Sequence, residues 1–143
     1  MQVSDAMTRD VRVANAEETI EQAARLMAGL DAGMLPVGEN NRLVGTITDR
    51  DIAVRAVAQG KGPETKVRDV MTDDVKYCFA DQQIDEVTAN MGDIQVRRLP
   101  VLDRDKQLVG ILALGDVATA RDGAAGEALA GICRPGGAHS QTG

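Results

Sequence analysis

The sequence predicts an α/β (α+β) protein made of two copies of one β-α-β-β-α unit, and an internal repeat is the first observation that indicates it. Residues 3–11 (VSDAMTRDV) match residues 67–75 (VRDVMTDDV), and LPV at 35–37 matches LPV at 99–101 in the same register. After a short insertion in the second copy, LVG at 43–45 matches LVG at 108–110. Because each copy has an apolar face to cover, we expect a pseudo-twofold pair in which each half covers the other.

Helical spacing of apolar residues is the second observation. Val11 and Val13 alternate with polar residues and indicate a short strand before the first helix. Asn15 with Glu18 is a candidate capping box for that helix, and Gly33 is its expected end. The apolar positions at helical spacing are Ile20, Ala23, Ala24, Met27 and Leu30 in the first copy, and Ile84, Val87, Met91 and Ile94, after Asp81, in the second.

Paired turns are the third observation. Polar residues at 39–42 and 103–106 separate short apolar runs in the two copies, which predicts a β-hairpin in each. The expected hairpin strands are 35–37 with 43–47 and 99–101 with 108–112, and the expected closing helices are 49–58 and 115–121. The order of elements is therefore β-α-β-β-α, twice.

The repeat also sets the expected organisation of the chain. The first repeat spans 1–59, a linker spans 60–66, and the second repeat spans 67–121. Residues 122–143 are rich in Gly and Ala, and we expect them to form a disordered tail.

Composition excludes several classes of function. The net charge is -6 and the aromatics are one Tyr and one Phe, which argues against binding duplex or single-stranded nucleic acid. No apolar run is long enough for a membrane span and the polar N-terminus is unlike a signal peptide, so we expect a cytoplasmic location. Two cysteines, Cys78 and Cys133, and one histidine, His139, exclude an ordinary zinc site. No catalytic residues and no enzyme activity are expected, because the domain contains no nucleophile beside a base.

The clearest candidate site is the segment GTITDRD at 45–51, where a strand passes into a helix. The N-terminus of a helix presents unpaired backbone N–H groups that suit phosphate. Thr48 adds a hydroxyl and Arg50 a planar cation, while Asp51 has two oxygens that suit the hydroxyls of a ribose. The alternative is structural, since Thr48 and Asp51 also have the spacing of a capping box, and the two roles are compatible.

The second copy differs at this segment. It keeps the acid as Asp116 but has Ala113 in place of the hydroxyl and Gly115 in place of the cation. It has Arg97 and Arg98 before its LPV strand, which are either phosphate ligands or a solvated basic pair. The two copies are therefore expected to differ in affinity.

The doubled M-T-x-x-V opening, the doubled L-P-V strand and the doubled V-G strand ending in Asp51 or Asp116 resemble the tandem cystathionine-β-synthase (CBS) domain pair, or Bateman module, over residues 1–121. The resemblance implies a stand-alone sensor that binds an adenine nucleotide (AMP, ADP, ATP or NAD) in clefts between the repeats. It also implies a homodimer and an unidentified protein target. The alternative is a homodimeric scaffold whose clefts are degenerate.

The resemblance also implies two sets of nucleotide-binding residues. The first set is Thr48, Arg50, Asp51, Thr72, Val75, Lys76, Val96 and Arg97, and the second is Asp116, Arg98, Thr8, Val11, Arg12, Ala32 and Gly33.

Overall fold

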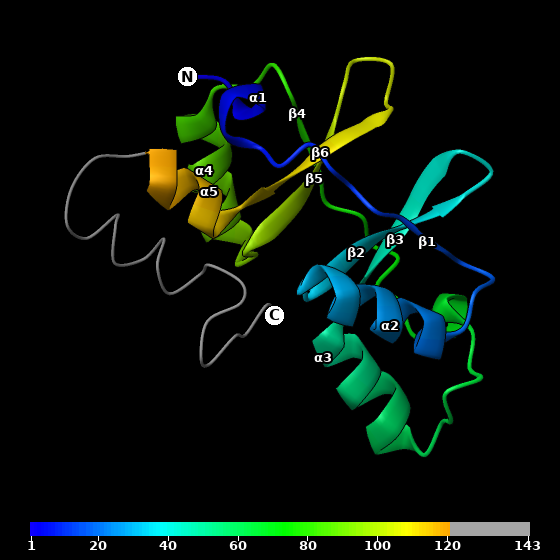
Figure 1. The fold of residues 1–143 in the computed structure, drawn as a ribbon. Helices are drawn as coiled ribbons and strands as arrows, with labels where there is room; N and C mark the ends of the chain where they lie inside the picture. The colour runs from blue at the N-terminus through cyan, green and yellow to red at the C-terminus, as the bar shows by residue number, and fades with distance from the viewer. Residues whose placement is uncertain (121–143) are drawn as a thin grey trace. The chain divides into compact units, whose positions relative to one another are not determined.

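The computed structural model describes residues 1–120, which form two compact units, each with its own three-stranded sheet (Figure 1). One unit comprises residues 12–75 and is called here the 12–75 unit. The other comprises residues 76–120 together with residues 1–11 and is called the 76–120 unit. The opening segment of each sequence copy thus belongs to the unit built from the other copy. The expected disordered tail at 122–143, with Cys133 and His139, lies outside the described residues.

The 12–75 unit has the predicted β-α-β-β-α order. Its strands are β1 (Ala14–Asn15), β2 (Met34–Glu39) and β3 (Arg42–Thr48), and its helices are α2 (Ile20–Leu30), α3 (Asp49–Asp51), the π-helix η1 (Ile52–Ala56), and the 3₁₀ helices η2 (Val57–Gln59) and η3 (Val67–Asp69). Strand β2 is central, parallel to β1 and antiparallel to β3. The expected helix at 49–58 is therefore present, but its middle turn is wider than an α-helix.

The 76–120 unit repeats this arrangement. Its strands are β4 (Cys78–Phe79), β5 (Arg98–Leu102) and β6 (Leu108–Ala113), and its helices are α1 (Val3–Ala6), α4 (Ile84–Ile94) and α5 (Leu114–Ala120). Strand β5 is central, parallel to β4 and antiparallel to β6. Helix α1, from the start of the chain, contacts β6 and α5, which come from the second sequence copy (Figure 1). The predicted fold class is confirmed, with two repeats of mixed α/β structure.

Three local predictions were wrong. The predicted strand at Val11 and Val13 is absent, because the chain passes from one compact unit to the other between residues 11 and 12, and β1 begins only at Ala14. Asn15 is not a helix cap, because helix α2 begins only at Ile20; its side chain instead closes a turn by accepting a hydrogen bond from the Glu17 backbone N–H at 2.8 Å.

The actual capping box is Thr19 with Gln22, one turn further along the chain than Asn15. Helix α2 ends at Leu30 rather than at Gly33, because the next residue, Asp31, adopts a left-handed conformation with φ of 52°. Asp is one of the few residues other than Gly that tolerates this conformation, so no glycine is needed at that position.

The predicted hairpin turns are confirmed. Asn40 and Asn41 join β2 to β3 with φ values of 53° and 63°, the signature of a two-residue turn that matches the twist of the strands. In the other unit, the Asp103 carboxylate accepts hydrogen bonds from the backbone N–H groups of Asp105 and Gln107. Each turn places its last strand antiparallel to the central strand, so that β3 and β6 both lead into the closing helix.

Each unit buries an aliphatic core of its own. The core of the 12–75 unit contains Ala14, Ala16, Ile20, Ala23, Met27, Leu35, Val37, Ile47, Ala56, Val67 and Val70. The core of the 76–120 unit contains Val3, Met7, Cys78, Ile84, Val87, Met91, Leu99, Val101, Leu112 and Val117. Ala24 and Leu30, which share the predicted helical spacing, are exposed, so the buried face of α2 is narrower than predicted. Within residues 1–120, no helix is both long and apolar enough to cross a membrane.

Candidate functional site

The Met-Thr pair that opens each sequence copy docks on the Val-Gly strand of the other copy. Thr72 exchanges two backbone hydrogen bonds with Thr46, at 2.9 and 2.8 Å, and Thr8 exchanges two with Ile111, both at 2.9 Å. The strand residue at the docking point is a glycine in both units, Gly45 and Gly110. Within each unit, the docked segment therefore comes from the opposite sequence copy and brings a threonine to the last strand.

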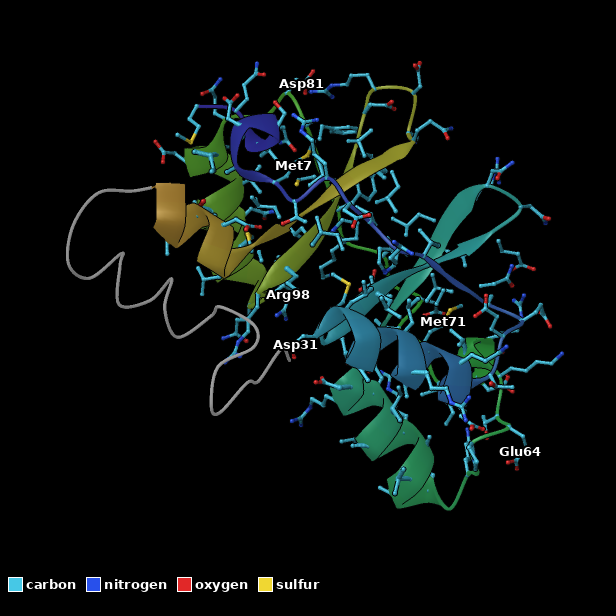
Figure 2. The ribbon with its side chains drawn as sticks, in the orientation of Figure 1. Met7, Asp31, Glu64, Met71, Asp81 and Arg98 are labelled. Atoms are coloured by element: carbon cyan, nitrogen blue, oxygen red, sulfur yellow. The ribbon has the colours of Figure 1, made fainter. Side chains whose placement is uncertain are left out.

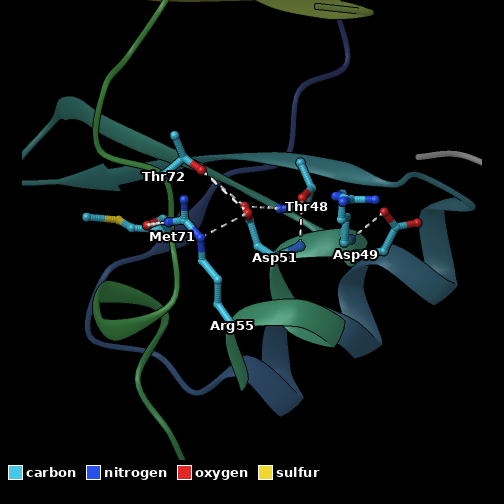
Figure 3. A network of polar contacts seen from close by, with 7 residues as sticks. Thr48, Asp49, Asp51, Arg55, Met71 and Thr72 are labelled. Carbon is cyan, nitrogen blue, oxygen red and sulfur yellow. Dashed lines mark hydrogen bonds and ion pairs between the residues drawn. The ribbon is translucent and has the colours of Figure 1, made fainter. Parts of the chain in front are cut away.

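Thr48 and Asp51 form a capping box where β3 ends and α3 begins. The Asp51 N–H donates to Thr48 Oγ1, and the Thr48 N–H donates to Asp51 Oδ2, both at 3.0 Å (Figure 3). The Thr72 hydroxyl lies 3.4 Å from both carboxylate oxygens of Asp51, so it makes only a weak bond. The Asp51 side chain is 13% exposed, which leaves a fixed carboxylate beside two hydroxyl groups.

Arg55 completes this cluster from the following helical turn. Its Nε lies 3.8 Å from Asp51 Oδ1, and its Nη1 donates a 3.1 Å hydrogen bond to the carbonyl oxygen of Met71 (Figure 3). Arg55 lies in the π-helical turn Ile52–Ala56, and single wide turns of this kind are frequent at functional sites. The Arg55 side chain is 53% exposed, so its guanidinium borders the solvent.

The first turn of this helix does not offer the N–H groups that the sequence led us to expect. The Asp49 N–H donates to the Gly33 carbonyl at 3.0 Å. The Arg50 N–H donates to Asp49 Oδ1 at 2.8 Å, and the Asp51 N–H is taken by Thr48. Because local acceptors already satisfy all three groups, any phosphate at this site depends on side-chain cations instead of the helix N-terminus.

The corresponding site in the 76–120 unit is simpler. Asp116 Oδ2 accepts a 2.9 Å hydrogen bond from the Ala113 N–H, as Asp51 does from Thr48, but Ala113 has no hydroxyl to return. Burial raises the pKa of the Asp116 carboxyl, and the Ala113 N–H and the charge of Arg98 partly offset this rise. Burial therefore disfavours the charged form of this carboxyl group.

The two compact units divide the expected binding residues. The 12–75 unit contains Thr48, Arg50, Asp51, Thr72, Val75, Arg12, Ala32 and Gly33, whereas the 76–120 unit contains Lys76, Val96, Arg97, Asp116, Arg98, Thr8 and Val11. Among these, the structure brings Thr48, Asp51 and Thr72 into contact. It also places Arg98 close enough to Asp116 for its positive charge to lower the pKa of that carboxyl group, against the rise caused by burial. The Arg97 carbonyl accepts a 2.8 Å hydrogen bond from the N–H of Leu114, the first residue after β6.

Sequence reasoning missed Arg55 and Met71. The spacing of Asp51 and Arg55, one helical turn apart, could have indicated that the two share a helix face. Nothing in the local sequence indicated that the Met71 carbonyl would meet Arg55, because that contact depends on how the opening segment docks.

Metal binding has no support within residues 1–120, which contain no group of three or more His, Cys, Asp or Glu side chains able to hold an ion. Cys78 is buried, and burial raises the pKa of its thiol to about 11. A thiol of this kind is a core residue that carries little thiolate near neutral pH.

Comparison with known proteins assigns the family. The family model for the CBS domain matches residues 3–57 and 67–123, which are the two sequence copies. The chain belongs to the CBS domain family. A CBS domain-containing protein of Bacillus subtilis, YhcV, is 39% identical over 132 residues, which cover 91% of this chain and 94% of that protein.

Solved structures of CBS proteins agree with the fold. A Burkholderia ambifaria structure, described as that of a signal-transduction protein with CBS domains, has a TM-score of 0.78 and 29% identity, covering 84% of this chain and 93% of that one. The CBS domain pair of protein MJ0100 has a TM-score of 0.76 and 27% identity, covering 84% of this chain and 94% of that one. That pair was solved in complex with 5′-methylthioadenosine and S-adenosyl-L-methionine.

Proposed function

We propose that this CBS-domain chain is a regulatory sensor that binds an adenine nucleotide, such as AMP, ADP, ATP or NAD, and performs no reaction on it. The observation that carries the proposal is the Asp51 carboxylate, which is largely buried and fixed by the Thr48 N–H beside the Thr72 hydroxyl. A ribose has two adjacent hydroxyls that can donate to one carboxylate, and a preformed acceptor loses little freedom on binding them.

Two further observations support this proposal. Asp116 repeats the same backbone-bonded carboxylate in the other unit, so the ribose-binding group is doubled. The related MJ0100 domain pair was solved with two compounds that both contain adenosine. Within the 12–75 unit, we expect the remaining members of the first set, Arg50 and Val75, to line the ligand, with the aliphatic side chain against the adenine.

The first test identifies the ligand without assuming it. We expect mass spectrometry to detect an adenine nucleotide that remains bound to the protein through native purification. Addition of that nucleotide at about 100 times its Kd should stabilise the folded state by about 2.7 kcal/mol, because the ligand binds only the native protein. A thermal melt measures this stabilisation.

Asp51→Asn is the matching variant, because asparagine keeps an oxygen for the Thr48 N–H while losing the charge and one acceptor. We expect this variant to melt normally without ligand and to lose most of the ligand-induced shift. Asp49→Asn is the control, since Asp49 is a carboxylate in the same turn that bonds the Arg50 N–H. If AMP, ADP, ATP and NAD at millimolar concentration leave the melting temperature of the wild type unchanged, the sensor proposal fails.

The competing function is a homodimeric scaffold with degenerate sites. It is favoured by the capping box itself, because Thr48 and Asp51 satisfy each other without any ligand. Partner binding measured with and without nucleotide, together with light scattering of the chain alone, separates the two functions. A cytoplasmic sensor that regulates a protein target should change partner binding when nucleotide is added, since a sensor needs different affinities in its two states. A scaffold should form the same homodimer at every nucleotide concentration.

A further inference from the structure

The 12–75 unit contains a guanidinium that is held in place beside the proposed ribose acceptor and still has unused donors. Arg55 Nη1 is anchored to the Met71 carbonyl at 3.1 Å, and Nε lies 3.8 Å from Asp51 Oδ1 (Figure 3). A guanidinium has five N–H donors. Among the described residues, these two contacts are the ones that Arg55 makes, so most of its donors face the solvent.

Distance explains why the contact with Asp51 leaves Arg55 available. At 3.8 Å, the Nε–Oδ1 pair is longer than a hydrogen bond, and half-exposed ion pairs of this kind contribute little to stability. The hydrogen bond to Met71 fixes the direction of the guanidinium before a ligand arrives. A side chain that is already ordered loses less entropy on binding, so the ligand is bound more tightly.

Position distinguishes Arg55 from Arg50, the cation that the sequence suggested first. Arg55 lies one helical turn after Asp51 and so shares its helix face, whereas Arg50 is the residue directly before Asp51 and projects at a different angle. The amides of the first turn are already bonded to Gly33, Asp49 and Thr48. A negatively charged group on a ligand whose ribose binds Asp51 would therefore meet Arg55.

We propose that Arg55 is a specificity-determining residue that makes the 12–75 unit prefer a phosphate-bearing adenine nucleotide over the uncharged nucleoside. This inference rests on the proposed nucleotide binding. The ribose hydroxyls bind Asp51, and the phosphate accepts charge-assisted hydrogen bonds from the outer donors of Arg55.

This arrangement of a carboxylate and a cation one helical turn apart is confined to the 12–75 unit. In the register that aligns Asp51 with Asp116, the position of Arg55 corresponds to Ala120, which carries no charge. The cation that acts on Asp116 is Arg98, at the start of strand β5, and not a residue of the following helix.

The test compares AMP with adenosine by calorimetry on the full chain. We expect wild type to bind AMP more tightly than adenosine. Arg55→Gln should weaken AMP binding by roughly tenfold while leaving adenosine within about twofold, since a charge-assisted bond to phosphate is worth at least about a factor of ten. Arg55→Lys keeps the charge and should restore most of the preference. If Arg55→Gln only disturbed the structure of the site, it would lower the affinities for AMP and adenosine equally.

Arg25→Gln is the matched control, because it removes the same charge from the same unit at a residue that, within residues 1–120, pairs only with Glu21 on the surface of α2. It should leave the ratio of AMP to adenosine affinity unchanged. An equal loss of the ratio in Arg25→Gln overturns the proposal, as does loss of the ratio in Arg50→Gln with retention in Arg55→Gln. Wild-type binding of both ligands with no preference overturns the role of Arg55 but leaves the sensor function intact, whereas failure of AMP, ADP, ATP, NAD and adenosine all to bind removes both.

Discussion

The carbonyl oxygen of Thr72 lies 2.6 Å from the position that a β-carbon would occupy on Gly45, and no side chain fits in that space. The glycine is therefore required by the segment docked on it, which comes from the next sequence copy. The other unit has the same relationship, with the Thr8 carbonyl 2.8 Å and Met7 Sδ 2.6 Å from a β-carbon at Gly110. Figure 2 labels Met7 and its counterpart in the 12–75 unit, Met71. The repeated Met-Thr and Val-Gly motifs are two halves of one contact.

Gly45→Ala tests this contact. We expect the substitution to lower the free energy of unfolding by roughly 1–3 kcal/mol, because an overpacked backbone contact cannot relax as the end of a flexible side chain can. Urea denaturation measures the loss. The control is Gly29→Ala in helix α2, where the added carbon would meet no described heavy atom within 4 Å apart from the adjoining residues and the backbone of the helix itself. Alanine there should be neutral or stabilising by up to about 1 kcal/mol, and equal losses in the two variants would contradict the docking contact.

Much of this arrangement could be predicted from the sequence, because repeated motifs and apolar spacing are local signals. The buried positions Ile20, Met27, Ile84 and Met91 and the pairing of Thr48 with Asp51 were all predictable in this way. The exchange of the opening segments between units was not a local signal: it followed only from the family resemblance, which groups Thr72 with Asp51 and Thr8 with Asp116. Two similar copies offer two equivalent docking partners for each Met-Thr segment, and only the fold decides between them.

Ala113→Ser should give the 76–120 unit the capping hydroxyl that Thr48 supplies in the other unit. We expect it to raise the free energy of unfolding by up to about 1 kcal/mol, because the new hydroxyl can accept from the Asp116 N–H. Thr48→Ala is the reverse change and should cost about 0.5–2 kcal/mol. Chemical denaturation of both variants checks the pair of predictions. A destabilised Ala113→Ser protein would show that the space beside Asp116 cannot accommodate a cap.

Asp116→Asn should stabilise the protein at pH 7. Burial raises the pKa of Asp116 above its ordinary value of 3.8, so the folded state binds this proton more readily than the unfolded state. Stability is therefore lost as the pH rises through the interval between the ordinary and the raised values. Asparagine removes that loss, and its advantage in urea denaturation should disappear as the pH is lowered toward 3.8. An advantage that persists at low pH would show that the gain has another cause.

Asp81→Asn should have the opposite dependence on pH. Arg104 hydrogen-bonds the Asp81 carboxylate at 2.7–3.0 Å and lowers its pKa. The stabilisation is present above the ordinary value of 3.8 and is lost as the pH falls through the lowered value. The asparagine variant should thus be slightly less stable than wild type at pH 7 and equal to it at the acid end of the series. A difference that does not change with pH would contradict the ionic origin of the contact.

Residues 12–75 should fold without the rest of the chain, whereas residues 1–59, the first sequence copy, should not. The core of the 12–75 unit includes Val67 and Val70, which the shorter fragment lacks. The lost segment also supplies backbone bonds to the start of α2, including 2.8 Å bonds from the Ile20 N–H to the Thr65 carbonyl and from the Val67 N–H to the Glu18 carbonyl.

The loss would also leave Glu17 without Lys66 and Arg68, which bind its carboxylate at 2.8 and 2.7 Å. We expect the 12–75 fragment to give dispersed amide signals by NMR and a cooperative urea transition. The 1–59 fragment should give neither, because its apolar face on α2 and β2 remains partly uncovered. Cooperative unfolding of 1–59 with the same midpoint would mean that the sequence copy, and not the compact unit, is the folding unit of this protein.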